Sequence, residues 1–179
     1  MVNDQRAGRI VGKQPDVTVR RGGTSDIVFV IELASELVGY SVPGGRTPDQ
    51  GLLATRIRDG LVALADRLAD DRFVILIGEV GAEPVGYLIL DLADREPTTG
   101  EPQALIVDIA VRRSDWGRYV THRLVREAAH VAERRGLGYL VGMISASNQR
   151  ALRTAERLGF TVERHQVVMR LPAAFPRRG

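Results

Sequence analysis

The feature of this sequence that most constrains its fold is a pair of apolar segments separated by a helix-like segment, between residues 104 and 144. The first apolar segment, ALIVDIAV at 104–111, is nearly continuous, which is typical of a strand buried on both faces of a sheet. A predicted helix runs to about Arg135, and GLGYLVGMI at 136–144 predicts a second strand. Because a helix between two such strands favours a right-handed crossover, we expect the two strands to be parallel.

Shorter patterns place the remaining elements around this unit. Alternating apolar residues predict strands, and apolar residues three and four apart predict helices. The predicted elements are a strand at 17–21, a helix at 24–38 capped by Thr24 or Ser25, a helix at about 52–68, hairpin strands at 73–80 and 85–93, a short helix at 147–159 capped by Ser147 or Asn148 and stopped by Gly159, and a final strand at 160–171. Their order predicts a mixed α/β sandwich with one central ligand crevice.

Length and composition indicate one folded domain with short ends. Of the 179 residues, 44% are hydrophobic, which is enough for a core in a domain spanning 17–171. We expect a flexible arm at 1–16 and a tail at 172–179. The chain has no cysteine, which excludes disulfides, cysteine nucleophiles and thiolate metal sites. We find no signal-peptide run and no apolar span long enough for a membrane, and expect a cytoplasmic protein.

The charge distribution favours a small anionic ligand over nucleic acid. The net charge is +3, almost all of the basic residues are arginines, and Lys13 is the only lysine. Acidic residues are interspersed among them, so no long basic run predicts a nucleic-acid surface. The three histidines lack the spacing of metal ligands, so we expect no metal site. His122, which begins a helix, could contact a phosphate or lie on the helix surface; His130 and His165 are expected at the surface or in packing.

Two local patterns carry a family resemblance. In SNQRALRTAERLGF, the spacing of Asn148, Ala151 and the Leu-Gly-Phe at 158–160 is similar to that of the GNAT superfamily of acyl-CoA-dependent N-acetyltransferases. LIVDIAVRRSDWGRYVTHRLV at 105–125 resembles the strand, loop and helix that bind the cofactor in that family. The resemblance spans roughly 17–171. It implies a GNAT-like fold: a mixed, mostly antiparallel sheet with a splayed parallel strand pair and flanking helices.

The resemblance also implies acetyl-CoA as the acyl donor. In the family, the pantetheine arm fills the slot between the splayed strands, and the diphosphate meets the start of the next helix, where free N–H groups favour negative charge. The residues that this implies for cofactor binding are Ile109, Ala110 and Val111 on the strand, Gly117, Arg118, Tyr119, Val120 and Thr121 at the turn and helix start, and Asn148 and Arg150 on the opposite side.

Four positions depart from the family pattern. Trp116, Tyr119 and Thr121 stand at the three characteristic positions of the diphosphate loop, the last two of them normally small, and bulky side chains there should hinder a diphosphate. Ala155 stands where many active members carry a tyrosine that protonates the leaving thiolate. Trp116 could either pack in the core or stack on an adenine. These departures leave open a non-catalytic GNAT-fold protein that binds a partner or ligand.

The general base is expected to be Asp108, the one acid in the 104–111 strand. An ion pair or a polar edge is the alternative role for this carboxylate, and burial is what would raise its pKa into a useful range. Glu79, Asp91 and a water relay are weaker candidates. The backbone N–H of Ile109 or Val111 could stabilise the thioester oxygen.

The function we expect is therefore an acetyl-CoA-dependent N-acetyltransferase. It would move an acetyl group to a primary amine of a small molecule or a protein by direct attack. The Gly- and Pro-rich loop at 39–51 is in the region that usually shapes the acceptor site. A homodimer is the expected assembly by analogy with the fold, with the final strand as an element that subunits could exchange.

Overall fold

The computed structural model describes residues 16–171, and the predicted arm and tail lie outside this range, except for Asp16. Up to residue 159 the elements follow the predicted order. They are β1 (Val17–Arg21), η1 (Thr24–Asp26), α1 (Ile27–Leu37), η2 (Val38–Tyr40), α2 (Gln50–Ala65), η3 (Leu68–Asp70), β2 (Phe73–Val80), β3 (Glu83–Arg95), β4 (Pro102–Val111), η4 (Arg113–Asp115), α3 (Val120–Arg134), β5 (Leu140–Gly142) and α4 (Gln149–Arg157).

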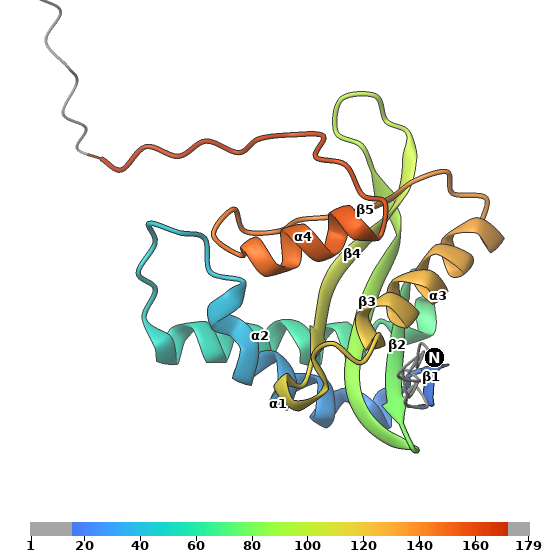
Figure 1. Cartoon of the computed structure of the whole chain (residues 1–179). Helices are drawn as coiled ribbons and strands as arrows, with labels where there is room; N and C mark the ends of the chain where they lie inside the picture. Colours follow the sequence, from blue (N-terminus) through green and yellow to red (C-terminus); the bar gives the residue numbers. More distant parts are fainter. Residues whose placement is uncertain (1–15, 172–179) are drawn as a thin grey trace, which may run out of the picture.

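The sheet has the strand order β1-β2-β3-β4-β5, and only its last pair is parallel (Figure 1). β2 and β3 form the predicted hairpin, with Ile77 opposite Tyr87. α3 connects β4 to the parallel strand β5, so the predicted parallel crossover is confirmed. The sheet is thus mixed and mostly antiparallel, as expected.

Helices cover both faces of the sheet. On one face, α1 and α2 pack on side chains such as Ile75, Ile77 and Ile89 in a core cluster. On the other face, α3 packs through residues such as Leu124 against Leu76 and Leu88. β3 is buried on both sides because its successive side chains enter the two clusters in turn.

β4 and β5 separate after a short stretch of pairing. Their register ends at Ile106 opposite Gly142, and β5 itself ends there. A register shift on the β3 side makes Val107 a bulge, which bends a strand and increases its twist. Among the described residues, no strand pairs with the β5 side of 107–111, so this part of β4 has an open edge.

Four predictions of local structure are wrong. Residues 160–171 form no strand and are almost entirely exposed, and the predicted strand at 136–144 is reduced to β5. Val107 is 49% exposed, so β4 is not buried on both faces throughout. Neither Thr24 nor Ser25 caps the first helix; instead the Asp26 carboxylate accepts the N–H of Gly23 at 2.9 Å. The Asn148 cap and the left-handed Gly159 stop are confirmed.

Candidate functional site

The open edge of β4 is the framework of the candidate site. Pantetheine-like chains can bind such an edge because the strand offers unpaired N–H and C=O groups. Ile109 is half-buried, while Ala110 and Val111 are buried at 8% and 6% exposure. The structure therefore brings these three predicted residues to the margin where the two parallel strands diverge.

Asp108 lies at this edge and is bonded to a residue that sequence reasoning missed. The hydroxyl of Tyr87, on β3, donates to Asp108 Oδ2 at 2.5 Å, and Tyr87 is fully buried. Burial raises the pKa of Asp108, while the hydrogen bonds from Tyr87 and from the Ile109 N–H act to lower it. Burial and the neighbouring carboxylate also raise the pKa of Tyr87, so the phenol stays protonated and donates.

Two backbone groups in the last three residues of β4 already have partners within the chain. The N–H of Ile109 donates to Asp108 Oδ1 at 2.9 Å, and the carbonyl of Val111 accepts from the Trp116 indole at 2.7 Å. Trp116 packs against both core clusters, which is the first of the two roles that the sequence left open. A ligand that used these two groups would have to displace or share these bonds.

The turn between β4 and α3 has a left-handed backbone at two residues, although Tyr119 and Thr121 stand where the family normally has small residues. Gly117 has φ +88° and Tyr119 φ +64°, so both adopt the left-handed conformation. This conformation strains a tyrosine, whereas glycine adopts it freely. The Tyr119 side chain is 59% exposed and its ring meets His122 edge-on, with centroids 6.4 Å apart. The ring therefore points outward and does not fill the core side of the turn.

Asp115 fixes the turn and is a second residue that sequence reasoning missed. It is buried at 6% exposure, and it accepts from Ser114 Oγ at 2.6 Å and from Arg118 at 3.1 Å. Arg118 is thus held beside the start of α3, with half of its side chain exposed. A burial signal for Asp115 is absent from the sequence because its burial depends on how the turn folds.

The first turn of α3 presents the helix N-terminus to this region. Val120 is buried, at 1% exposure, and its side chain packs over Gly78 and Gly86, where a Cβ would lie 2.9 and 3.2 Å from it. The position of Val120 therefore seats the helix on the sheet. Thr121 is half-buried and follows directly, so its N–H belongs to the unpaired first turn of the helix.

On the opposite side, Asn148 and Arg150 are brought close to the turn. Asn148 accepts from the Ala151 N–H at 3.1 Å and donates to the Tyr40 carbonyl at 3.3 Å, so it both caps α4 and holds η2. The guanidinium of Arg150 lies 3.8 Å from the centre of the Trp116 ring. The structure thus places the start of α4 beside Trp116, in the turn after β4, and beside η2.

The weaker candidates for the general base are held in ion pairs with arginines. Glu79 pairs with Arg20 at 2.7 Å, and Asp91 pairs with Arg72 at 2.6 Å. His130 contacts Glu133 on the surface of α3, and His165 is exposed. Within residues 16–171 no group of three His, Asp or Glu side chains could hold a metal ion, and no helix is long and apolar enough to cross a membrane.

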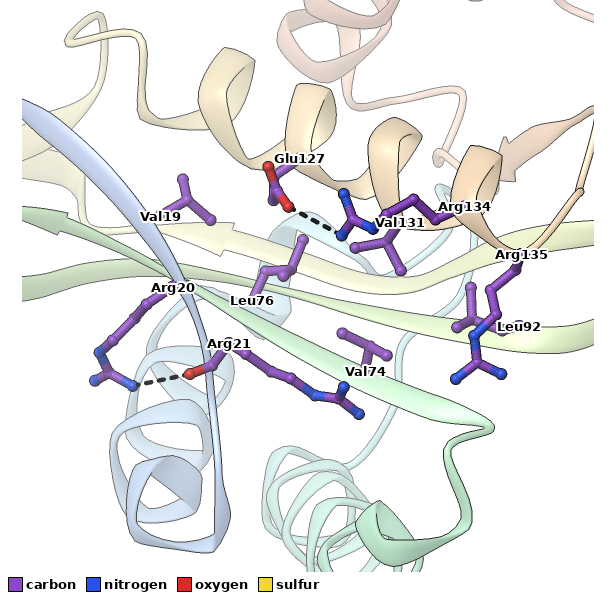
Figure 2. Close-up of a pocket in the computed structure, with 10 residues that line it drawn as sticks. All are labelled: Val19, Arg20, Arg21, Val74, Leu76, Leu92, Glu127, Val131, Arg134 and Arg135. Atoms are coloured by element: carbon purple, nitrogen blue, oxygen red, sulfur yellow. Dashed lines mark hydrogen bonds and ion pairs between the residues drawn. The ribbon is translucent and has the colours of Figure 1, made fainter.

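A cavity of about 170 Å³ lies away from this site, between α3 and β1–β3 (Figure 2). Arginine side chains surround an apolar floor that includes Val74 and Leu76. They are matched by acids: Arg134 contacts Glu127, and Arg21 contacts Asp71. Internal ion pairs therefore neutralise much of the charge around this cavity.

Comparisons with known proteins agree with the fold. The sequence pattern of the family described as Acetyltransferase (GNAT) family matches residues 47–160. No curated protein matches the sequence. A GCN5-related N-acetyltransferase from Ralstonia eutropha JMP134 has a similar structure, with a TM-score of 0.68, 19% identity, and coverage of 86% of this chain and 97% of that one.

Two further solved structures share the fold. A ribosomal-protein-alanine N-acetyltransferase from Brucella melitensis biovar Abortus 2308 has a TM-score of 0.61 at 19% identity, over 87% of this chain and 99% of that one. The aminoglycoside N-acetyltransferase AAC(6')-Iy in complex with CoA has a TM-score of 0.67 at 13% identity, over 92% of this chain and all of that one.

Proposed function

Because the chain belongs to the acetyltransferase (GNAT) family, we propose that it transfers the acetyl group of acetyl-CoA to a primary amine. The observation that supports this most is the open edge of β4 with Asp108 beside it. The pantetheine arm would lie along 107–111 as an added strand, and the diphosphate would meet the start of α3. The fit rests on the edge of β4 at 107–111, with which no strand of residues 16–171 pairs, and on the helix N-terminus that follows.

The reaction is a direct attack. The amine nitrogen forms a bond to the thioester carbon, the carbon–sulfur bond breaks, and the amine proton passes to Asp108 or to a water that Asp108 holds. Ala155 offers no hydroxyl at the position expected for an acid, so the thiolate leaves as the anion and is protonated by solvent. A thiolate is a sufficiently good leaving group for this route, because thiols are far stronger acids than alcohols.

Asp108 is suited to the role of base by its surroundings. Its carboxylate lies in a partly buried position where loss of water raises the pKa, which makes it a stronger base than an exposed aspartate. Tyr87 holds one carboxylate oxygen and thereby fixes its orientation. Tyr87 is accordingly a positioning residue, since it acts through Asp108.

The acceptor would approach from the face covered by α1 and α2. Tyr87 belongs to the core cluster on that face, and Asp108 points toward it. The loop at 39–51, which joins the two helices, contacts the α4 side through Ser145 and Asn148. The structural neighbours include an aminoglycoside N-acetyltransferase and a ribosomal-protein-alanine N-acetyltransferase, so we propose small-molecule and protein amines as the two acceptor classes.

A second candidate is a GNAT-fold protein that binds a ligand without acetyl transfer. It is favoured by the internal bonds at Ile109 and Val111 and by the strained Tyr119 in the diphosphate turn. Each of these raises the free-energy cost of binding a cofactor in the family's manner. The two candidate functions are therefore distinguished by whether the protein consumes acetyl-CoA.

A thiol-release assay with acetyl-CoA and a panel of primary amines tests the proposal. We expect amine-dependent release of CoA that falls by a factor of at least about 100 in Asp108→Asn, the usual scale for loss of a general base. Glu36→Gln, an acid on α1 with no assigned role, serves as the matched control and should keep full activity. Binding of acetyl-CoA without thiol release by any amine would favour the second candidate.

A further inference from the structure

The sequence Arg-Arg-Gly occurs at 20–22 and again at 134–136, and the structure brings the arginines of both stretches to the cavity between α3 and β1–β3 (Figure 2). The first stretch ends β1, and the second ends α3. Because successive side chains of a strand point to opposite faces, Arg20 points to the face of α1, where it pairs with Asp26 at 2.7 Å, and Arg21 faces α3. None of these arginines belongs to the candidate acetyl-transfer site, which lies at the other end of α3.

The cavity carries one positive charge more than the acids in contact with it neutralise. Three arginines face it, and their ion pairs in the described chain use two carboxylates. Arg134 contacts Glu127 at 3.4 Å, while Arg21 and Arg135 share a single oxygen of Asp71, at 3.3 and 3.7 Å. Figure 2 shows the side chains of Arg21 and Arg135 reaching toward each other from β1 and from the end of α3. The two guanidiniums therefore lie close together, and they have N–H donors left for a second carboxylate.

The ion pairs at the cavity are long. Charged hydrogen bonds usually measure about 2.7–2.9 Å, and on β3 Asp91 pairs with Arg72 at 2.6 Å. The cavity pairs are all 3.3 Å or longer, and the side chain of Asp71 is 71% exposed. Exposed pairs of this kind contribute little to stability. A ligand carboxylate can therefore bind these guanidiniums without breaking a contact on which the fold depends.

The end of α3 does not oppose an anion here. A helix C-terminus carries about half a negative charge on its free carbonyl groups. In α3 the carbonyls of Ala132 and Glu133 accept N–H groups from residues 135–137, and Arg134 and Arg135 each add a whole positive charge at the same end. The arginines therefore outweigh the helix dipole.

The floor of the cavity is apolar and has room for one compact group. The apolar side chains that line it are those of Val19, Val74, Leu76, Leu92 and Val131. They offer water no hydrogen-bond partner, so an apolar group is preferred over water there. The volume is about 170 Å³. Apolar cavities of about 150 Å³ accept a benzene ring, so a group of that size fits this floor.

From the charge and the lining together we infer that this cavity binds a small carboxylate that carries one compact apolar group about the size of a benzene ring. The apolar group lies on the floor near Val74, and the carboxylate accepts hydrogen bonds from Arg21 and Arg135. A single excess positive charge matches a monoanion and not the dianion of a phosphate ester. The inference does not rest on the proposed acetyl transfer, because the two sites share no residue.

Calorimetry of the full chain with benzoate as the probe tests the binding. We expect saturable binding with a Kd of about 1 mM or lower, the scale that a ligand of so few atoms allows. Benzamide has the same shape without the charge, and acetate has the charge without the ring, so each should bind at least about 10-fold more weakly. No saturation by benzoate up to about 10 mM, or equal binding of benzamide, would overturn the inference.

Paired variants test the two arginines. Arg21→Gln/Arg135→Gln should raise the Kd for benzoate at least about 10-fold, since charged hydrogen bonds are lost. Arg58→Gln/Arg126→Gln is the matched control, because it removes two charges from exposed helix positions outside the cavity lining and should keep the wild-type Kd. An equal change in both double variants would show that benzoate responds only to net charge, contrary to the inference.

Methyl NMR spectra of the wild-type chain locate the bound probe. The ring current of benzoate should shift the methyl signals of Val74, Leu76 and Val131, which line the cavity. The methyl signals of Val107 and Val120, at the candidate acetyl-transfer site, should stay in place. Shifts confined to Val107 and Val120 would place the carboxylate at that site and overturn the inference.

Discussion

At the scale of single residues, the pair Tyr87–Asp108 shows what sequence can and cannot reveal. Asp108 was identifiable because it is the only acid in an apolar strand. Tyr87 was not, because its contact depends on how β3 pairs with β4, including the bulge at Val107. The same is true of Asp115, whose burial follows from the turn and not from its neighbours in the chain.

The first prediction concerns the pH dependence of acetyl transfer. The base must be deprotonated, so the rate should fall as the pH decreases through the pKa of Asp108, which burial raises above the ordinary value of about 3.9. Tyr87→Phe removes a hydrogen bond that lowers this pKa, and should move the acid limb of kcat/KM to higher pH. At pH values well above the limb, its rate should approach that of the wild type.

A profile measured for both proteins checks this expectation. If Tyr87→Phe lowered the rate equally at every pH, Tyr87 would have only a structural role. Asp108→Asn should lack the part of the acid limb that the carboxylate sets, because no carboxylate remains to titrate there.

The second prediction concerns stability and the Asp26 carboxylate. The hydrogen bond from Arg20 lowers the pKa of Asp26, so its contribution is present above the unfolded pKa and is lost as the pH falls through the folded pKa. Asp26→Asn should reduce the free energy of unfolding by about 2 kcal/mol at pH 7, since two charged hydrogen bonds are weakened. The difference should shrink as the pH falls below about 4, the unfolded value.

Urea denaturation at several pH values measures this effect. Asp71→Asn is the control: Asp71 is 71% exposed and 3.3 Å from Arg21, so we expect a change within about 0.5 kcal/mol. Equal losses in the two variants would argue against a special role for the Asp26 contacts.

At the scale of elements, the helices and hairpin could be predicted because their apolar periodicity coincides with burial. The absence of a strand at 160–171 could not be predicted in this way. Alternation at 160–171 indicates that a segment can pair, but it does not say whether an edge is available within the same chain. β5 is likewise shorter than predicted. The apolar pattern continues to residue 144, whereas β5 stops pairing with β4 at Gly142.

Two glycines in different elements should respond oppositely to alanine. Gly60 lies inside α2, and an added Cβ would meet nothing within 4 Å, so Gly60→Ala should stabilise by about 0.5–1 kcal/mol. At Gly86 on β3 the Cβ would lie 2.9 Å from the Ala110 carbonyl oxygen, so Gly86→Ala should destabilise by about 1–3 kcal/mol. Thermal unfolding of both variants is the measurement, and a stabilised Gly86→Ala would contradict this packing.

At the scale of the whole molecule, the strand–helix–strand unit was sufficient to predict a parallel pair in an otherwise antiparallel sheet. The family resemblance from residues 105–125 and 147–160 is confirmed by the match over 47–160. What the sequence could not show is the geometry of the slot: where β4 and β5 separate, and which backbone groups there are already bonded. Those features arise from pairing between distant segments and from the bulge.

Hydrogen exchange with and without acetyl-CoA tests the central claim most directly. If the cofactor lies along the open edge of β4 and against the start of α3, exchange should slow at residues 107–111 and 120–122. Asn148→Asp, which keeps an oxygen to cap α4 but loses the amide donor, should weaken this protection. Unchanged exchange at saturating acetyl-CoA, or protection confined to the cavity between α3 and β1–β3, would contradict the account.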